Sequence, residues 1–173
     1  MNVLTNIFQD WKINSRNPKI QVLLVFFRLA HLLRQKGHLG LLLGFPIFLI
    51  YRLFFEWILG IELPWQTRVG PNLRIFHGFG LVVNDRVVLG EGVILRHLTS
   101  IGVKGTGEFG TGDVPRIGNY VDIGSHVVIL GNVVVGDHAK IGAGSVVVKD
   151  VPAHAVVVGN PARVVRIEEE VKT

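Results

Sequence analysis

The sequence predicts a mainly β protein built around a parallel β-solenoid, because its C-terminal half repeats every six residues. From Ile117 to Pro152 the chain divides into six consecutive hexads. The first position of each hexad is Ile or Val, the second is Gly in four of the six, and the fifth is small or β-branched. A helix repeats every 3.6 residues, whereas short strands joined by corners fit a period of six, with the first residue inward and Gly at the bend. Three hexads make one coil, so the coils stack as parallel strands.

Looser hexads extend the solenoid toward the N-terminus. Their apolar first positions run in two frames: Leu63, Val69, Ile75, Leu81, and then Val83, Leu89, Leu95, Ile101. The offset between the frames predicts a small bulge at a corner near Leu81–Val83. Val103–Pro115 contains four glycines and adds ten residues beyond one hexad. We therefore expect a solenoid over residues 61–166 with an extruded loop at 103–115, where binding residues commonly sit, and a polar tail over 167–173.

Charge and residue usage narrow the class of function. The chain has 173 residues, a net charge of +5 and no cysteine. Disulfides, thiolate metal sites and cysteine nucleophiles are therefore excluded. Residues 1–60 hold seven Lys or Arg against Asp10 and Glu56, whereas the rest of the chain has eleven basic and eleven acidic residues. The neutral solenoid argues against nucleic-acid binding.

Residues 1–60 are expected to form a helical segment that is basic and apolar. Apolar runs cover Lys19–Lys36 and Leu41–Leu59. The longest uncharged stretch, Gly37–Tyr51, has about 15 residues and contains Pro46, so it is shorter than the ~20 residues that span a bilayer. Two interpretations remain open: helices that pack on the solenoid or on a neighbouring subunit, or an interfacial helix pair. We expect a cytoplasmic protein. If the second interpretation is correct, the helices hold it at the inner face of the membrane.

The hexad phase places His77 and His97 in one column. Both are third residues of their hexads, so they should stack one rung, ~4.8 Å, apart. If the loop is a pure insertion, Ser125 and Ala143 continue the column. This pattern predicts a groove with a base at its mouth. The alternative is two surface histidines aligned by chance, with His97 in a packing role.

The hexads, the loop and the ending IGAGSVVVKDVPAHAVVVGNPARVVR resemble the hexapeptide-repeat acyltransferases, which are left-handed parallel β-helices. The resemblance covers about Leu49 to Arg166, and it is strongest to serine acetyltransferases and to colanic acid (exopolysaccharide) acetyltransferases. Its most specific marks are Gly60-Ile-Glu-Leu, Phe76-His-Gly-Phe-Gly and Leu95-Arg-His-Leu-Thr-Ser-Ile-Gly. The resemblance implies that His77 is the general base. Glu62 stands where that family has an aspartate that orients the base.

Two positions depart from the serine acetyltransferase pattern. Phe76 replaces the acidic residue before the catalytic histidine, and Asp113-Val114 replaces the Arg-His pair after the loop. In that family these residues hold the amino acid, so the departures imply an acceptor other than serine. Phe76, His97 and Asp113 are then the candidate acceptor-binding residues.

The residues present favour direct acetyl transfer from acetyl-CoA to a hydroxyl. An imidazole, with an ordinary pKa of about 6.5, is suited to accept the hydroxyl proton at neutral pH. The chain has no cysteine and no recognisable nucleophile elbow, which disfavours an acyl-enzyme. Backbone N–H groups around Gly102 are candidates for binding the oxyanion. The remaining candidates for contact with acetyl-CoA are Ser125, Ala143, Gly144, Lys149, Arg163 and Arg166. The alternative for Lys149, Arg163 and Arg166 is that their charges are only solvated.

We therefore expect a homotrimeric O-acetyltransferase that needs no metal and acts on a free or lipid-linked saccharide of exopolysaccharide synthesis. A trimer is expected because one face of a narrow prism is too shallow to enclose a thioester, and a three-fold ring closes naturally. Three alternatives remain: a serine acetyltransferase, a zinc hydratase resembling γ-class carbonic anhydrases, and a non-catalytic scaffold. The hydratase lacks support because His126 and His138 are 12 residues apart, without that family's His-x4-His pair.

Overall fold

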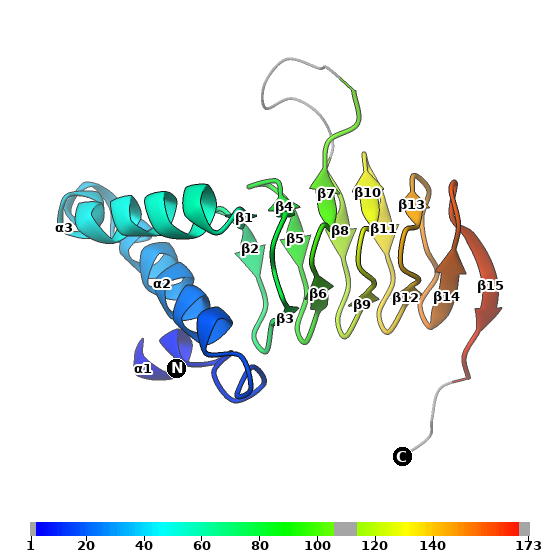
Figure 1. Cartoon of the computed structure of the whole chain (residues 1–173), viewed down its shortest axis with the longest axis horizontal. Coiled ribbons are helices and arrows are strands. Elements are labelled where there is room, and N and C mark those ends of the chain that lie inside the picture. Colours follow the sequence, from blue (N-terminus) through cyan, green and yellow to red (C-terminus); the bar gives the residue numbers. More distant parts are fainter. Residues whose placement is uncertain (1–2, 106–113, 170–173) are drawn as a thin grey trace.

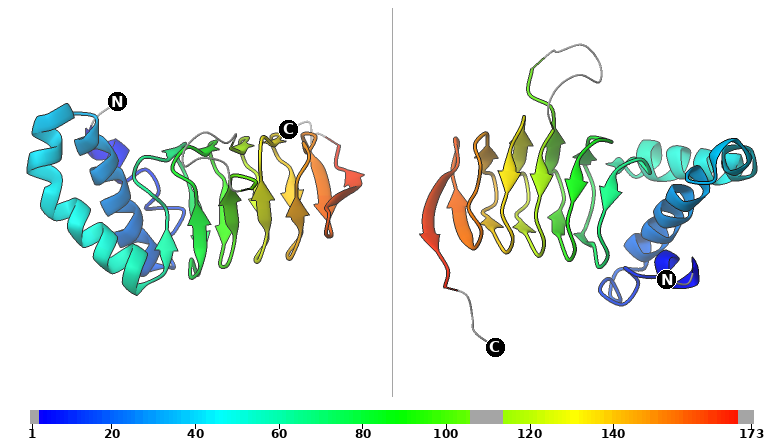
Figure 2. Two further views of the ribbon diagram at one scale, coloured as in Figure 1. Left: turned by 90° about the horizontal axis from the view of Figure 1, so that it is seen from above. Right: turned by 180° about the vertical axis from the view of Figure 1, so that it is seen from behind.

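The computed structural model describes residues 3–105 and 114–169, and within these ranges a helical segment is followed by a β-solenoid (Figure 1). The helices gather at the N-terminal end of the solenoid, and the last described strand lies at the other end (Figure 2). They are α1 (Val3–Ile7), α2 (Pro18–Arg34), α3 (Gly37–Ile50) and the π-helix η1 (Tyr51–Ile58).

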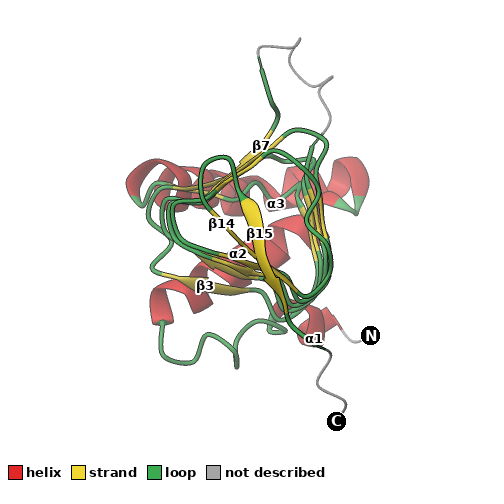
Figure 3. Ribbon diagram, turned by 90° about the vertical axis from the view of Figure 1, so that its right-hand side faces the viewer, coloured by secondary structure: helices red, strands yellow, loops and turns green. Residues whose placement is uncertain are grey.

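Three sheets form the faces of a prism, as the end-on view shows (Figure 3). Sheet A contains, in order, β1 (Ile61–Glu62), β4 (Leu81–Val83), β7 (Ser100–Gly102), β10 (Val128–Leu130) and β13 (Val146–Val147). Sheet B contains β2 (Arg68–Val69), β5 (Val88–Leu89), β8 (Arg116–Ile117) and β11 (Val134–Val135). Sheet C contains β3 (Arg74–Phe76), β6 (Ile94–Arg96), β9 (Asp122–Ile123), β12 (Lys140–Ile141), β14 (Ala155–Val158) and β15 (Arg163–Ile167). Consecutive strands up to β14 change sheet, so the predicted parallel solenoid is confirmed. The final strand, β15, instead returns antiparallel to β14.

The strand register confirms the predicted phase of the hexads. Ile75 pairs with Leu95, and Ile123 pairs with Ile141, all in sheet C. These first-position side chains point into the prism and are at most 3% exposed. Tight stacking also explains a glycine at the second position: a Cβ at Gly124 would lie 2.6 Å from the backbone nitrogen of the next coil.

The ten-residue insertion between β7 and β8 is also confirmed by register. Leu89 pairs with Ile117, 28 residues on, whereas Ile117 pairs with Val135 after 18 residues. Residues 106–113 of the expected loop lie outside the described residues.

The expected bulge lies one corner earlier than predicted. Leu81 pairs with Ile61 and Val83 pairs with Ile101, so both belong to the regular strand β4. The two extra residues instead lie in the corner between β3 and β4. Gly78 and Gly80 supply positive φ angles of 80° and 63° there, which a glycine adopts at little cost.

The segment that precedes the solenoid covers its open edge at strand β3. The Asn14 side chain donates to the Leu73 carbonyl (2.8 Å) and accepts from the Ile75 amide (3.2 Å). Asp10 accepts from the Leu73 amide (2.9 Å) and forms a buried ion pair with Arg28 (2.8 Å). These side chains satisfy backbone groups that an exposed edge strand would offer to other chains.

Helix α2 begins and packs as its sequence predicts. Asn17 caps its N-terminus and Pro18 occupies the first turn, both of which favour a helix start. Ile20, Leu24 and Phe27 recur on one face and are buried, so α2 docks as an amphipathic helix.

The segment from α3 to η1 is longer than predicted. The helix continues through Pro46, and Gly37–Ile58 provides 22 residues that are long and apolar enough to cross a membrane by length and composition alone. The expectation of a stretch too short to span is therefore wrong. That expectation counted only uncharged residues, whereas Arg52 and Glu56 pair one turn apart (3.5 Å) inside the helix. Tyr51 ties this helix to the first coil by donating to the Leu63 carbonyl (2.7 Å).

Candidate functional site

The predicted histidine column lies along the corner between sheets C and A, which we call the C–A corner. His77 follows β3 and His97 follows β6, and the pairing of Phe76 with Arg96 places the two histidines on adjacent rungs. Their ring centroids are 5.6 Å apart, with an interplanar angle of 81°. The predicted placement of these two side chains one rung apart is therefore confirmed, and their rings meet edge to face.

A third imidazole, His126, extends this column and was missed by the sequence reasoning. Its ring centroid lies 5.1 Å from that of His97, and its amide donates to the His97 carbonyl (3.1 Å). The hexad pattern predicted that Ser125 would continue the column. His126 has a φ of 59°, and this left-handed conformation turns the chain at the corner. The available signal was a histidine at the fourth position of the hexad, where the corner bends.

The middle histidine of the column has an unusual environment. Its Nδ1 atom is buried and has no hydrogen-bond partner within residues 3–105 and 114–169. A buried polar atom without a partner costs roughly 1–3 kcal/mol. His97 therefore keeps a hydrogen-bonding atom that no described residue satisfies.

Helix α2 holds the corner that carries His77. The Lys19 ammonium donates to the His77 carbonyl and lies 3.8 Å from the centre of the Phe79 ring. Burial lowers the pKa of Lys19. His77 itself has a φ of 68° and an exposed side chain. A left-handed backbone at a residue other than glycine costs energy and is common at functional sites.

Glu62 lies on another part of the surface. It lines a cavity of about 820 Å³ on the outer face of sheet A with Glu56, Trp57 and Gly102, whereas His77 lines a separate cavity of about 290 Å³. No hydrogen bond joins Glu62 to His77 in the described part of the chain. Burial raises the pKa of Glu56, and nearby Glu62 adds to the shift while Arg52 opposes it. The predicted role of Glu62 in orienting His77 is thus not realised in this structure and stays a prediction.

Phe76 is engaged by arginines on the outer face of sheet C. The guanidinium carbons of Arg74 and Arg96 lie 4.4 and 5.3 Å from the ring centre. Arg96 is further fixed by an ion pair with Asp122. Phe76 therefore packs beside fixed positive charge, and its predicted contact with the acceptor stays a prediction. The other candidate, Asp113, lies outside the described residues.

The small residues expected to contact the cofactor follow the histidine column. The Gly144 amide donates to the Ser125 carbonyl (2.9 Å), and Ala143 and Gly144 are exposed. Gly144 has a φ of 71°, and a Cβ there would meet nothing within 4 Å. An extended ligand therefore has open backbone along this part of the corner.

The remaining cofactor candidates are scattered. Lys149 follows β13 at the corner between sheets A and B, whereas Arg163 and Arg166 belong to β15 in sheet C. Arg166 pairs with Glu168 (3.0 Å). Gly102 ends β7, and its carbonyl accepts from the Gly131 amide (3.0 Å). The structure does not bring these residues into one site.

The zinc hydratase alternative gains no support from the described ranges. Among residues 3–105 and 114–169, no three His, Asp or Glu side chains are grouped so that they could hold a metal ion.

Comparisons with known proteins identify the family. Residues 115–149 match the family model described as bacterial transferase hexapeptide (six repeats). An Escherichia coli K12 protein named "Putative colanic acid biosynthesis acetyltransferase WcaB" is 35% identical over 161 residues, covering 91% of this chain and 98% of that protein.

Solved structures agree with the sequence match. The soybean serine acetyltransferase apoenzyme superposes with a TM-score of 0.78 at 31% identity, over 94% of this chain and 69% of that one. A serine acetyltransferase complex with CoA superposes with a TM-score of 0.74 at 25% identity, also over 94% and 69% of the two chains. With its six-residue repeats, parallel solenoid and N-terminal helices, this chain belongs to the hexapeptide-repeat family of acetyltransferases.

Proposed function

We propose that the protein transfers an acetyl group from acetyl-CoA to a sugar hydroxyl of a surface or exopolysaccharide precursor. The observation that carries this proposal is the column at the C–A corner, which begins with the exposed imidazole of His77 and continues along open backbone at Ala143 and Gly144. The name of the Escherichia coli relative, which refers to colanic acid biosynthesis, supports the saccharide. The CoA complex of a serine acetyltransferase supports the co-substrate.

His77 is suited to act as general base in this reaction. The acceptor hydroxyl must lose its proton as its oxygen adds to the thioester carbonyl, and an imidazole at the mouth of the column can take that proton. The C–S bond then breaks, and the protonated imidazole returns the proton to the CoA thiolate. No covalent intermediate with the protein is needed, and the proton count balances.

The described residues that line the cavity beside His77 include no carboxylate that could bind the α-ammonium group of an amino acid acceptor. Phe76 precedes His77 in sequence, and the guanidinium groups of Arg74 and Arg96 pack against its ring. An α-ammonium group would therefore approach fixed positive charge, and no carboxylate stands at Phe76 to bind it. A neutral sugar hydroxyl carries no such penalty.

An acceptor panel tests the proposal directly. Purified protein with acetyl-CoA should release CoA faster with saccharide precursors than with L-serine. Transfer to L-serine alone would overturn the saccharide assignment and support the serine acetyltransferase alternative, which the superposition on those enzymes favours.

We also propose that the active form is a homotrimer. The cavity beside His77 measures only about 290 Å³, below the ~300–1,000 Å³ usual for small-molecule sites. The loop at residues 103–115 of a neighbouring copy would cover the column. Light scattering should show a trimer, and a stable monomer with full activity would contradict this proposal.

The long apolar helix supports a location at the cytoplasmic face of the membrane. Leu42 and Trp57 are 74% and 73% exposed. Arg52 is exposed on the same helix, and Arg34 and Lys36 are exposed just before it begins. Anionic headgroups attract each basic residue near the surface by ~1 kcal/mol, and apolar burial adds to this.

Vesicle sedimentation tests this location. The full chain should sediment with anionic vesicles, bind less at high salt, and lose binding in Leu42→Gln/Trp57→Gln. The matched control is Val164→Gln/Val165→Gln, which removes exposed apolar side chains of β15 at the other end. Absence of sedimentation at low salt would assign the exposed helix to subunit contacts instead.

A further inference from the structure

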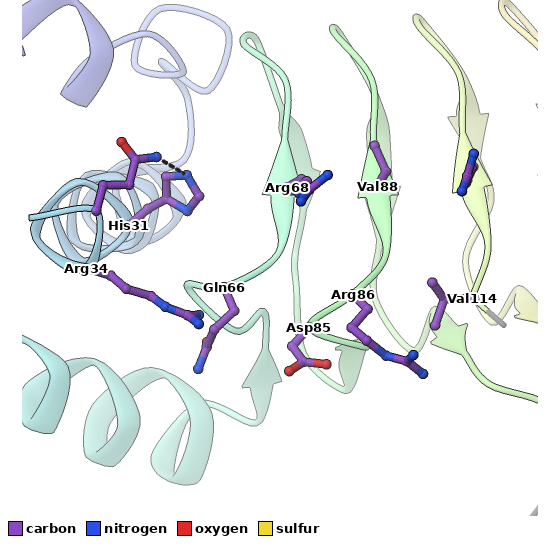
Figure 4. Close-up of a pocket in the computed structure, with 10 residues that line it drawn as sticks. His31, Arg34, Gln66, Arg68, Asp85, Arg86, Val88 and Val114 are labelled. Carbon is purple, nitrogen blue, oxygen red and sulfur yellow. Dashed lines mark hydrogen bonds between the residues drawn. The ribbon is translucent and has the colours of Figure 1, made fainter. Parts of the chain in front are cut away.

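A basic cavity lies between helix α2 and the outer face of sheet B, away from the histidine column (Figure 4). It measures about 780 Å³. Four arginines line it, and Asp85 is the only carboxylate among its described lining residues. The arginines are Arg34, Arg68, Arg86 and Arg116. Figure 4 shows that Arg34 enters from α2 while Arg68 and Arg86 come from the first two coils.

This concentration of charge contrasts with the rest of the solenoid. From Ile61 onward the chain has eleven basic and eleven acidic residues, so the solenoid is neutral as a whole. Two basic side chains elsewhere on its surface have carboxylate partners: Arg96 pairs with Asp122 and Lys140 pairs with Glu168.

Three arginines of the cavity lack such partners. Arg34, Arg68 and Arg116 form no ion pair with any carboxylate in the ranges 3–105 and 114–169. Exposed guanidinium groups without a carboxylate partner keep their N–H donors available to an anion. Three such groups on one wall therefore suit a ligand that supplies negative charge.

The sheet fixes the spacing of two of these side chains. Arg68 pairs with Val88, which pairs with Arg116, so the two arginines occupy the first and third rungs of one outward-facing column. Rungs are ~4.8 Å apart, which separates the two backbone positions by ~10 Å. Val88 leaves a small apolar floor between them. Flexible guanidinium groups at this separation can converge on adjacent phosphoryl groups, each through paired N–H donors.

We propose that this cavity binds the diphosphate group of a ligand through Arg34, Arg68 and Arg116. Two sources carry this chemistry: a sugar activated or lipid-linked through a diphosphate, and the diphosphate of CoA itself. The choice between these two sources rests on the proposed function. The proposal that the cavity binds a diphosphate does not depend on that function. Sheet B faces away from the C–A corner within one chain, so the site is distinct from the column at His77.

Titration calorimetry with inorganic pyrophosphate tests the site. The wild-type protein should bind pyrophosphate, and Arg68→Gln/Arg116→Gln should weaken binding at least about tenfold, because each charge-assisted contact contributes more than a neutral one. Lys140→Gln is the control, since it removes an exposed positive charge of sheet C that no binding role has been assigned to. Thermal unfolding should show that all variants fold. Absence of binding to the wild-type protein, or equal weakening in the control, would overturn the proposal.

Competition separates the two sources of the diphosphate. If saturating acetyl-CoA displaces pyrophosphate, the site serves the co-substrate; if a nucleoside diphosphate sugar displaces it and acetyl-CoA does not, the site serves the acceptor. If neither displaces it, the cavity does not bind a biological diphosphate, and the proposal fails. His77→Ala should bind pyrophosphate as the wild type does. Failure of acetyl transfer and failure of this site are thus distinguishable.

Discussion

The solenoid stacks ring side chains along two of its corners, and the two stacks differ in how their rings meet. At the corner between sheets B and C, Tyr120, His138 and His154 stack with their planes nearly parallel, at 19° and 11°. The ring centroids are 5.1 and 5.0 Å apart, and Tyr120 donates to the Glu91 carboxylate (2.7 Å). Each ring face is covered by the next ring, so this B–C stack acts as packing between coils.

In the C–A column, neighbouring imidazole rings meet edge to face instead. Both of its ring pairs have interplanar angles of 81°. His97 keeps a buried nitrogen without a partner in the described chain, while His77 is exposed at the end of the column. One fold therefore carries ring columns of different geometry at two of its corners. The contrast shows that ring contact alone does not distinguish the two corners, whereas a buried nitrogen without a partner beside an exposed imidazole makes the C–A column the better candidate for a functional site.

The largest expected effect comes from removing one histidine from each stack. His77→Ala should lower the acetyl transfer rate by ~10²–10⁴-fold, the usual contribution of a general base. His138→Ala should keep the rate within about twofold of the wild type, since surface changes away from a site have small effects. Acetyl-CoA affinity should change at most a few-fold in either variant. A His77→Ala enzyme that retains more than about a tenth of the rate would remove the functional difference between the corners.

The two corners also differ in what supports them, and this predicts the largest change in stability. Asp10 accepts from the Leu73 amide and pairs with Arg28 below the strand that leads to His77. Asp10→Ala should therefore lower the free energy of unfolding by ~3–5 kcal/mol, because it leaves a buried guanidinium without its partner. Glu91→Gln, which alters an exposed contact of the B–C stack, should cost less than ~1 kcal/mol. Urea unfolding measures both, and equal losses would contradict the difference in support.

Much of the C–A column followed from sequence periodicity alone. A strict period of six fixes which side chains point inward, and the inward set fixes which corner residues share a column. That reasoning paired His77 with His97 and located the ten-residue insertion before Ile117. It works because tight stacking of coils leaves the backbone few alternatives: a Cβ at Gly124 would clash with the next coil.

The misses have physical causes. The hexad pattern did not predict His126 in the column, because a residue with a left-handed backbone at a corner does not follow the inward–outward alternation of a strand. The family resemblance assigned Glu62 to orient His77, but the Glu62 carboxylate lines a different cavity from His77 in this structure, so that role stays a prediction. The basic cavity escaped because its arginines are far apart in sequence and meet only when α2 docks on the solenoid.

His126 offers a sharper and smaller test of the column. If the edge-to-face contact with His97 helps to hold the functional geometry, His126→Ala should lower the acetyl transfer rate by about tenfold, less than loss of the base itself. Its effect should appear in kcat more than in the KM for acetyl-CoA, and His126→Gln should recover part of the rate. A matched change in the other stack, His154→Ala, should leave kcat near the wild-type value. Equal kcat values for the two alanine variants would place His126 with the packing histidines.

The smallest expected effect concerns Tyr120 in the B–C stack. The hydrogen bond to Glu91 raises the pKa of the Tyr120 phenol, and partial burial and the Glu91 charge act in the same direction. A raised pKa in the folded state means that folding favours the neutral phenol. Its contribution to stability is therefore complete below the ordinary tyrosine pKa of ~10 and is lost as pH rises through the folded-state value.

Tyr120→Phe, which has no phenol, should remove this pH dependence. The urea midpoint of the wild type should exceed that of the variant near neutral pH, and the difference should shrink above pH ~10. Acetyl transfer at neutral pH should be the same for both proteins, because this stack supports packing between coils. A midpoint difference that stays constant into the alkaline range would show that the Tyr120–Glu91 contact does not stabilise the stack. Reduced acetyl transfer in the variant would show instead that the B–C stack acts on the reaction.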